Sequence, residues 1–240
     1  MNQAVHSRRA SRAGKLGTGK SLAAAAKAGR KAETTGRTND PERTMADIID
    51  VAMREFAEKG LAGARIDVIA EAMRTSKRMI YYYFGSKEGL YIAVLEEAYR
   101  RMRQIEHGLH LEDLPPEDAL RKLVGFTVDY QLAHPDYIRL VMTENIHRGE
   151  YLAQSKIIQK INVPAIEGLR MVYERGVKAG VFRSGLDPVD LHQSISALSF
   201  FNVSNRHTFT LIFQRDMESA PAVAARRESI IDMVVRYVRK

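Results

Sequence analysis

Cysteine is absent from this sequence of 240 residues. Its absence excludes disulfide bonds, cysteine-ligated zinc sites and thiol nucleophiles. Long apolar runs are missing too, because no stretch approaches the roughly 18 residues that a membrane-spanning helix needs. The first residues lack the apolar segment of a secretory signal peptide. We therefore expect a cytoplasmic protein without a membrane partner.

The common catalytic motifs are also missing. The sequence contains no GxSxG nucleophile elbow and no HExxH zinc motif. Glu144-x-x-His147 is half of a di-iron motif whose second copy is absent. His107-x-x-His110 lacks acidic or cysteine company at ligand spacing. We predict that the protein is not an enzyme and has neither a metal site nor a cofactor.

Acidic residues are scarce in the first part of the chain. The first 40 residues carry nine Lys or Arg side chains against two acidic ones, which is +7 of the chain's net charge of +8. Large apolar residues are almost absent there, so the segment cannot bury enough surface to offset the entropy of ordering. Residues 1–39 are therefore interpreted as a disordered basic arm. Such an arm either raises DNA affinity through phosphate contacts or is a tail without a role.

One nucleotide-binding pattern lies inside this arm. Residues 14–21 match the P-loop pattern GxxxxGK[ST], with Lys20 and Ser21 at its end. A P-loop works only between a buried strand and a helix, where backbone amides surround phosphates. The preceding residues contain no strand-like apolar run, so a nucleotide-hydrolysing enzyme is kept only as an alternative.

Residues 64–90 predict two short helices, a turn and the start of a third helix. Apolar residues recur with helical spacing at Ile66, Ile69, Ala70 and Met73. Ser76 offers an N-cap to the second helix. Gly85 ends that helix, and Ser86 caps the next one.

The second of these helices has an unusual outer face. Ile80 and Phe84 are four residues apart, so they share the buried side. Residues step by about 100° around a helix, which directs Arg78 and Tyr82 outward. A helix-turn-helix whose second helix enters the major groove explains this face; a helical hairpin with a tyrosine-rich packing face is the alternative.

This stretch resembles the DNA-binding motif of the TetR family of bacterial transcriptional regulators. The matching residues span roughly 43–105 and include Gly60-Leu61, Ile69-Ala70, Ser76-Lys77, Ile80-Tyr81-Tyr82-Tyr83-Phe84 and Ser86-Lys87-Glu88-Gly89-Leu90. The chain departs from the family pattern in three places. Ala64-Arg65 replaces a Thr pair, Arg74 replaces a turn Gly, and Tyr83 replaces a common His. A left-handed Arg74 would cost about 1 kcal/mol.

The resemblance implies DNA contacts, carried over by position in the motif. Arg78, Met79 and Tyr81 would face bases, and Lys77 would reach a base or a phosphate. The expected phosphate contacts are Arg65, Thr75, Ser76, Tyr82, Tyr83 and Lys87.

Every segment after residue 108 reads as helical, so the predicted fold class is all-α. We expect a helix-turn-helix DNA-binding domain at 40–86, a connecting helix at 87–107 and a helical effector-binding and dimerisation domain at 108–240. The expected helices of this last part cover residues 117–133, 135–146, 151–161, 164–179, 188–203 and 222–238.

The last two long helices have more apolar surface than one small body needs. In the family, the matching helices form a four-helix dimer interface, so the resemblance implies a homodimer. The alternative is that these residues form an intramolecular core, because periodicity alone cannot separate the two.

The resemblance also implies an effector of unknown identity, bound inside the helical body. Pockets combine apolar walls with a few orienting polar groups, so polar interruptions in apolar stretches are the candidates. They are His134, Thr143, Asn145, His147 and Arg148 on one segment and Phe200, Phe201, Asn202 and Asn205 on another. Adjacent Phe200 and Phe201 point about 100° apart, so at most one should line a pocket.

Together these observations predict a cytoplasmic, nucleoid-associated transcriptional regulator. It would be a homodimeric repressor that a small molecule releases from a palindromic double-stranded DNA operator. An architectural, nucleoid-type DNA-binding protein that relies on the basic arm is the second alternative.

Overall fold

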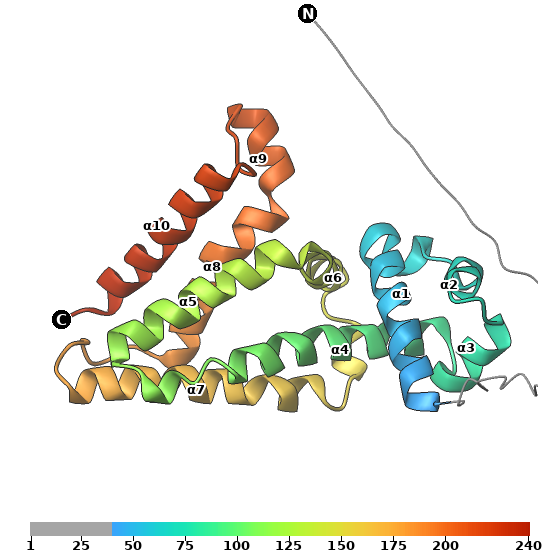
Figure 1. Cartoon of the computed structure of the whole chain (residues 1–240), viewed down its shortest axis with the longest axis horizontal. Helices are drawn as coiled ribbons and strands as arrows, with labels where there is room; N and C mark the ends of the chain where they lie inside the picture. Colours follow the sequence, from blue (N-terminus) through green and yellow to red (C-terminus); the bar gives the residue numbers. More distant parts are fainter. Residues whose placement is uncertain (1–39) are drawn as a thin grey trace, which may run out of the picture. The chain divides into compact units, whose positions relative to one another are not determined.

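The structure, a computed structural model, describes residues 40–240 (Figure 1). The basic arm and the pattern at residues 14–21 lie outside the described residues. Within the described part there are helices and no named strand, which confirms the predicted all-α class. The α-helices are α1 (Pro41–Gly63), α2 (Ile66–Ala72), α3 (Lys77–Phe84), α4 (Lys87–His107), α5 (Pro116–Ala133), α6 (Pro135–Ile146), α7 (Ile158–Lys178), α8 (Pro188–Ser204), α9 (Arg206–Phe213) and α10 (Ala220–Val238).

Helix α1 has a capped start and a glycine break near its end. The Asp40 side chain accepts hydrogen bonds from the amides of Glu42 at 3.1 Å and Arg43 at 3.2 Å, and Pro41 occupies the first turn. Gly60 has φ 66° and breaks the regular helix, so Leu61 to Gly63 form a separate final turn. The buried stripe of α1 therefore ends near this break.

Helices α2 and α3 are held together by a tight turn. Arg74 has φ 51°, the left-handed conformation that its position in the turn requires. The amide of Arg65 donates to the Glu55 carboxylate at 3.1 Å, so α1 supplies a partner at the start of α2, where Arg65 makes no side-chain cap. Gly85, with φ 75°, then separates α3 from α4.

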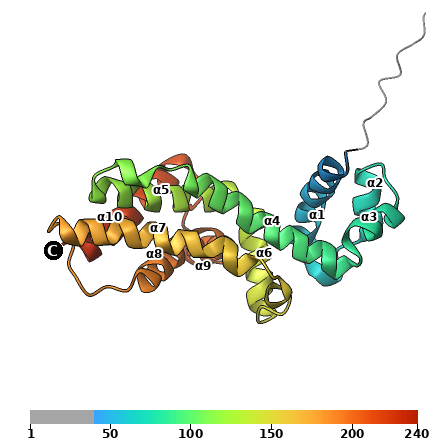
Figure 2. The same ribbon diagram turned by 90° about the horizontal axis from the view of Figure 1, so that it is seen from below.

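One hydrophobic core extends from the helix-turn-helix into the rest of the chain. It includes Phe56 of α1, Ile80 of α3 and Leu95 of α4, and it continues to Leu140 of α6. Figures 1 and 2 show α4 running from the α1–α3 end toward α5 and α7. Helix α6 also packs against α1. The α1–α3 end is therefore coupled to the body through both α4 and α6.

A second core fills the body between α5, α7, α8 and α10. Its fully buried members include Val124, Val172 and Val235. The amide of Arg183 donates to the carbonyl of Val238 at 2.8 Å, and that of Lys240 to Val181 at 3.2 Å. These bonds fix the end of the chain against the turn that follows α7.

The predicted helix at 151–161 and the predicted break before residue 164 are wrong, whereas the end of the predicted helix at 164–179 is confirmed. The structure has a short 3-10 helix, η2 (Leu152–Gln154), followed by the single helix α7, which contains Pro164. Pro164 is exposed, so water can satisfy the carbonyl that loses its partner. Burial of Ala165, Leu169 and Val172 on a different side of the helix favours one continuous helix.

Helix α9 was not expected. It follows α8 after a single break at Asn205. Its last residues, Leu211, Ile212 and Phe213, are more than 60% exposed, so no buried face gave it a clear helical period.

Candidate nucleic-acid interface

Helix α3 presents the predicted outer face. Ile80 is fully buried and Phe84 packs against the core, whereas Tyr82 is 77% exposed. Arg78 is exposed too. The helix is therefore anchored from one side only, and its other side is free to meet a partner. This places Arg78 and Tyr82 outside the molecule, as their helical positions predict.

The start of α3 carries a small charged network. The Ser76 hydroxyl accepts from the amide of Met79 at 3.3 Å and so caps the helix. Asp67 of α2 pairs with Arg65 at 2.6 Å and lies 3.9 Å from the Lys77 ammonium. The hydrogen bond from Arg65 lowers the pKa of Asp67. Arg65 and Lys77 are thus exposed cations oriented by one carboxylate.

Four other predicted contacts are less available. Thr75, Met79 and Tyr83 are half-buried, and the Tyr83 ring packs against the core and lies 5.3 Å from the Tyr82 ring. The Lys87 ammonium donates to the carbonyl of Ala62 at 3.3 Å. Lys87 therefore ties α4 to the end of α1 as well as being a candidate for phosphate.

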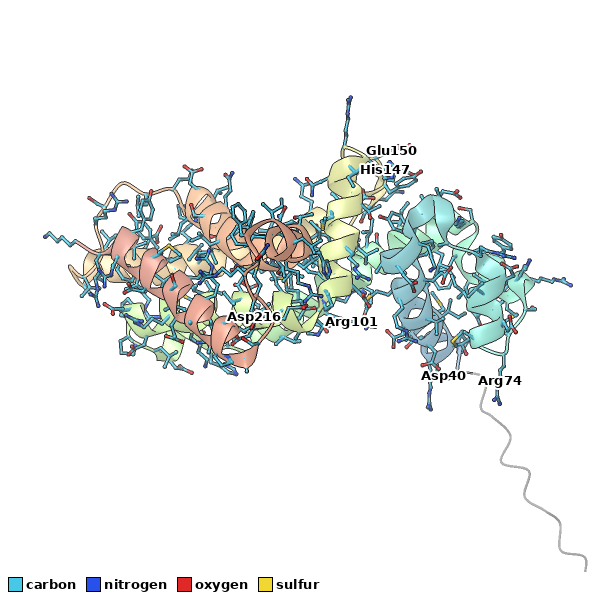
Figure 3. The ribbon with its side chains drawn as sticks, turned by 90° about the horizontal axis from the view of Figure 1, so that it is seen from above. Asp40, Arg74, Arg101, His147, Glu150 and Asp216 are labelled. Carbon is cyan, nitrogen blue, oxygen red and sulfur yellow. The ribbon has the colours of Figure 1, made fainter. Side chains whose placement is uncertain are left out.

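Arg74 is a further candidate contact, in addition to those that the motif positions predict. It is exposed in the turn between α2 and α3, and Figure 3 shows it at the outer edge of the α1–α3 end. Within residues 40–240 its guanidinium has no hydrogen bond or ion pair. The signal was present in the sequence as an arginine at a turn position that favours glycine.

The predicted effector residues do not gather at one place. On α6 and its C-terminal side, Asn145, His147 and Arg148 are exposed, and the hydroxyl of Thr143 donates to the Arg139 carbonyl at 2.9 Å. His134 is exposed and stacks on Tyr130 with ring centroids 4.0 Å apart. Figure 3 shows His147 well apart from Asp216, which lines a cavity of about 460 Å³. None of these five residues lines the cavity between α8 and α10 or the cavity between α4 and α7.

Two residues of α8 do reach a cavity. Phe201 and Asn202 line a space of about 460 Å³ between α5, α8, α9 and α10. Phe200 packs against the first core instead, so adjacent phenylalanines diverge as predicted. Asn205 is exposed and its amide donates to the Ser204 hydroxyl. A smaller cavity of about 320 Å³ lies between α4, α5 and α7.

The two residues of the half di-iron pattern lie in different environments. Glu144 is buried, and its carboxylate accepts from the amide of Leu152 at 2.8 Å, whereas His147 is exposed. Burial, reinforced by Glu144, raises the pKa of Tyr91. Glu144 therefore stabilises the junction between α6, α4 and η2.

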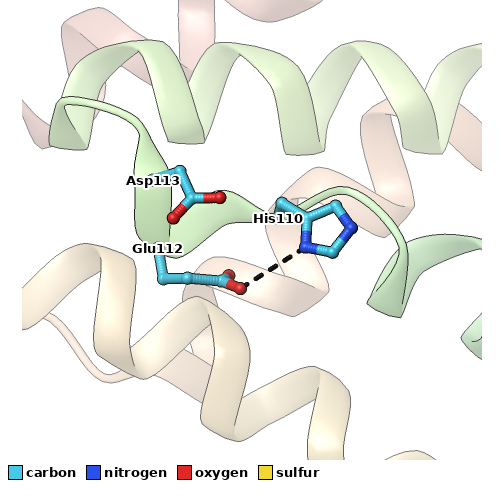
Figure 4. A group of neighbouring side chains, drawn as sticks. All are labelled: His110, Glu112 and Asp113. Atoms are coloured by element: carbon cyan, nitrogen blue, oxygen red, sulfur yellow. Dashed lines mark ion pairs between the residues drawn. The ribbon is translucent and has the colours of Figure 1, made fainter.

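The structure does bring three possible metal ligands together. His110, Glu112 and Asp113 present ligand atoms within 4.8 Å of one another, and the His110 ring lies 3.6 Å from the Glu112 carboxylate (Figure 4). Both acidic neighbours come from the 3-10 helix η1 (Leu111–Asp113), directly after His110, so the expectation that His110 lacks acidic company at ligand spacing is wrong. All three side chains are exposed, which is also the ordinary arrangement of a solvated ion pair on a loop.

Comparisons with known proteins agree with the helix-turn-helix assignment. Residues 48–94 match the family described as bacterial regulatory proteins, tetR family, and residues 116–234 match the tetracyclin repressor-like C-terminal domain. Residues 14–21 lie outside both matches. Among the helices of residues 40–240, none combines the length and the apolarity that a bilayer crossing requires.

Individual relatives extend the match over most of the chain. The HTH-type transcriptional repressor NicS of Pseudomonas putida is 36% identical over 208 residues, covering 87% of this chain and 98% of that protein. The crystal structure of the putative transcriptional regulator SCO4942 from Streptomyces coelicolor aligns with a TM-score of 0.61 at 28% identity, covering 81% of this chain and 98% of the other. A tetR-family regulatory protein from Rhodococcus RHA1 aligns with a TM-score of 0.64 at 20% identity over 82% and 97% of the two chains, which shows the shared fold.

The geometry of α3, the two family matches and the nearly full-length relative agree with one another. The chain belongs to the TetR family of bacterial regulatory proteins and is a DNA-binding transcriptional regulator.

Proposed function

We propose that this regulator is a homodimeric repressor that binds a palindromic operator and is released from it by a small molecule. The outer face of α3 is the observation that carries the proposal. Arg78 and Tyr82 project from a helix whose only anchor is on the opposite side, which is the arrangement that a recognition helix needs in the major groove.

We assign the contacts according to exposure. Arg78 reads base edges, because guanidinium groups pair with guanine in the major groove. Tyr81, which is 43% exposed, and the half-buried Met79 lie beside it and contact bases at its flanks. The remaining predicted contacts hold phosphates and fix the register without reading sequence. They are Arg65, Thr75, Ser76, Lys77, Tyr82, Tyr83 and Lys87, to which we add Arg74.

Dimerisation is supported by apolar side chains on the outside of α8 and α10. Val189 of α8 and Met233 and Tyr237 of α10 are exposed. Large apolar groups on the surface of two neighbouring helices are typical of a protein–protein interface. A twofold dimer would present two α3 helices, and its operator would repeat a half-site in inverted orientation.

Repression and release rest on the relatives and on linkage. The relative NicS is named as a repressor. If a ligand binds more tightly to the form that has left DNA, it must weaken operator binding by the same factor. Helices α4 and α6 both connect the body to the DNA-binding end, which gives such a ligand a route of action. We expect the protein to work in the cytoplasm on nucleoid DNA.

Selection of bound sequences from random DNA tests the proposal. We expect enrichment of one inverted repeat, and reduced transcription from a promoter that carries this repeat. Enrichment of no sequence would contradict sequence-specific recognition and favour an architectural protein. Increased transcription would contradict repression.

A further inference from the structure

The larger cavity has the size and the walls of a ligand site. Its volume of about 460 Å³ falls within the range of small-molecule pockets, roughly 300–1,000 Å³. Val128 and Leu132 of α5 form one side, and Phe201 and Phe209 form another, with ring centroids 5.7 Å apart in an edge-to-face arrangement. The body of a ligand in this cavity would therefore meet apolar and aromatic groups.

The polar part of the cavity is built around Arg226 of α10. Asn202 is 7% exposed, and its amide nitrogen donates to carbonyls of its own helix. Its amide oxygen accepts from the Arg226 Nε at 3.1 Å. A buried asparagine thus fixes the plane of the guanidinium. Among the described residues, no hydrogen bond or ion pair occupies the two terminal nitrogens of Arg226, which are the donors that bind a carboxylate in pairs.

The charges around Arg226 favour an anion. Arg215 and Arg227 also line the cavity. Arg227 is neutralised by Asp129 at 2.8 Å. Asp216 is the acidic residue of the lining, and its carboxylate accepts from the amides of Glu218 and Ser219 at 2.9 and 3.0 Å. Hydrogen bonds from Ser219 and Glu218 lower the pKa of Asp216, which therefore keeps its negative charge. Arg215 and Arg226 carry two positive charges against this one negative charge, so the net charge of the cavity lining is positive.

We propose that this cavity binds an organic carboxylate with an aromatic or branched aliphatic body. The carboxylate pairs with the terminal nitrogens of Arg226, and the body packs against Phe201 and Phe209. As the effector of the regulator, this ligand rests on the proposed function. It would act on α8 and α10, the same helices whose outer apolar residues we assign to the dimer.

Direct binding to the purified full-length protein tests the assignment. Isothermal titration with benzoate, 4-phenylbutyrate and 2-naphthoate is compared with titration of the corresponding primary amides. We expect at least one carboxylate to bind tenfold or more tightly than its amide. Equal affinity of acid and amide, or no saturable binding by any probe, would overturn the proposal without recourse to a variant.

Two variants locate the bound carboxylate. Arg226→Gln keeps much of the side-chain length but removes the charge, and we expect it to weaken binding at least tenfold. Arg236→Gln removes another arginine of α10, exposed and outside the cavity lining, and should leave the affinity unchanged. Unaltered binding by a folded Arg226→Gln protein would place the ligand elsewhere. Should that variant misfold, Phe201→Leu is the substitute and is expected to weaken 2-naphthoate more than benzoate.

Measurements of DNA binding distinguish a failure of this inference from a failure of the proposed function. We expect the tightest carboxylate to lower operator affinity at the concentration that saturates the protein. Saturable binding that depends on Arg226 but leaves operator affinity unchanged would support the cavity and overturn its effector role. Failure to bind any specific DNA, with carboxylate binding intact, would overturn the proposed function alone.

Discussion

The position of each α3 side chain around the helix determines whether it is buried or exposed. Ile80 points inward and contributes to the core, whereas Arg78 and Tyr82 point outward. This division could be predicted because an eight-residue helix with one buried residue fixes its own rotation. The local partners could not be predicted. Asp67 engages both Arg65 and Lys77, and only the packing of α2 against α3 reveals this.

Arg74 and Tyr82 should contribute affinity without sequence preference. Arg74→Asn keeps the left-handed turn, which asparagine tolerates, but removes one positive charge. We expect it to weaken binding to all sequences by a similar factor and to reduce the slope of log affinity against log salt by about one. Tyr82→Phe should weaken binding by about 1 kcal/mol and alter the salt slope little. Fluorescence anisotropy at several salt concentrations measures both.

A change in sequence preference for either variant would contradict this assignment. For Arg74→Asn, an unchanged salt slope would show that its guanidinium does not contact phosphate.

His192 should make the protein sensitive to acid. Burial, and secondarily the charge of Arg103, lowers its pKa from 6.5 to about 4. Between these values the unfolded chain binds a proton that the folded protein does not, so stability falls as pH is lowered from about 6.5 to 4. The full effect is of the order of 3 kcal/mol, since each pKa unit corresponds to about 1.4 kcal/mol.

Urea unfolding at pH 7, 6, 5 and 4.5 measures this dependence. We expect His192→Gln to lose less stability than the wild type over this window, because it removes the titrating group. Parallel losses for the two proteins would show that other groups control the acid response.

The effector residues show what single-residue reasoning misses. Thr143 and Asn145 donate to carbonyls four residues earlier, at 2.9 and 2.8 Å, within their own helix. Such local bonds satisfy polar groups as well as a ligand does. Asn202 instead shares its oxygen with Arg226 of another helix. Sequence spacing cannot distinguish the two cases, because the partner of Asn202 is 24 residues away.

At the scale of elements, caps and breakers predicted most helix boundaries. Ser76 starts α3, Ser86 starts α4, and Gly85 separates α3 from α4. The failures occurred where a local signal competed with packing. Pro164 predicted a break that the buried face of α7 overrides, and α9 has no buried face to give a period.

The junction of α3 and α4 requires glycine at position 89. A Cβ there would lie 2.1 Å from the carbonyl oxygen of Phe84, a backbone atom that cannot move freely. We expect Gly89→Ala to destabilise the protein by about 1–3 kcal/mol through overpacking. Equilibrium unfolding in urea measures the loss.

Gly168→Ala is the matched control. Apart from the neighbouring backbone of its own helix, no atom lies within 4 Å of its added methyl group, and alanine is favoured over glycine inside a helix by about 0.5–1 kcal/mol. We expect this variant to be slightly more stable than the wild type. If Gly89→Ala unfolded at the same urea concentration as Gly168→Ala, the close approach of α3 and α4 would be wrong.

At the scale of the whole molecule, one core joins the DNA-binding end to the body. It connects Ile48 of α1 with Leu140 of α6 and Val203 of α8. The division at residues 86 and 108 remains a prediction, because these segments share one hydrophobic cluster. Such continuity could not be read from periodicity, which identifies a buried face but not what covers it.

If α10 lies in the dimer interface, a charge introduced on its outer face should weaken dimerisation. Met233 is 38% exposed on this helix, and Met233→Glu would place two charges in the proposed interface. Burying an unpaired carboxylate costs several kcal/mol, so we expect the dissociation constant of the dimer to rise at least a hundredfold, with loss of operator binding. Analytical ultracentrifugation measures the mass at several concentrations.

Val163→Glu places the same charge on an exposed residue of α7 and should remain dimeric. A dimeric Met233→Glu protein would argue against an interface at α10, and dissociation of both variants would indicate a general effect of added charge.

The most direct test of the account is the ratio of operator affinity to random-DNA affinity for the wild type and for Arg78→Ala. Arg78 is the exposed cation in the centre of the face that we assign to the bases. We predict that Arg78→Ala reduces operator affinity by about 1–3 kcal/mol while random-DNA affinity changes little, so the ratio falls at least fivefold. If the wild type prefers its operator and a folded Arg78→Ala protein has the same ratio, recognition by this face of α3 would be contradicted.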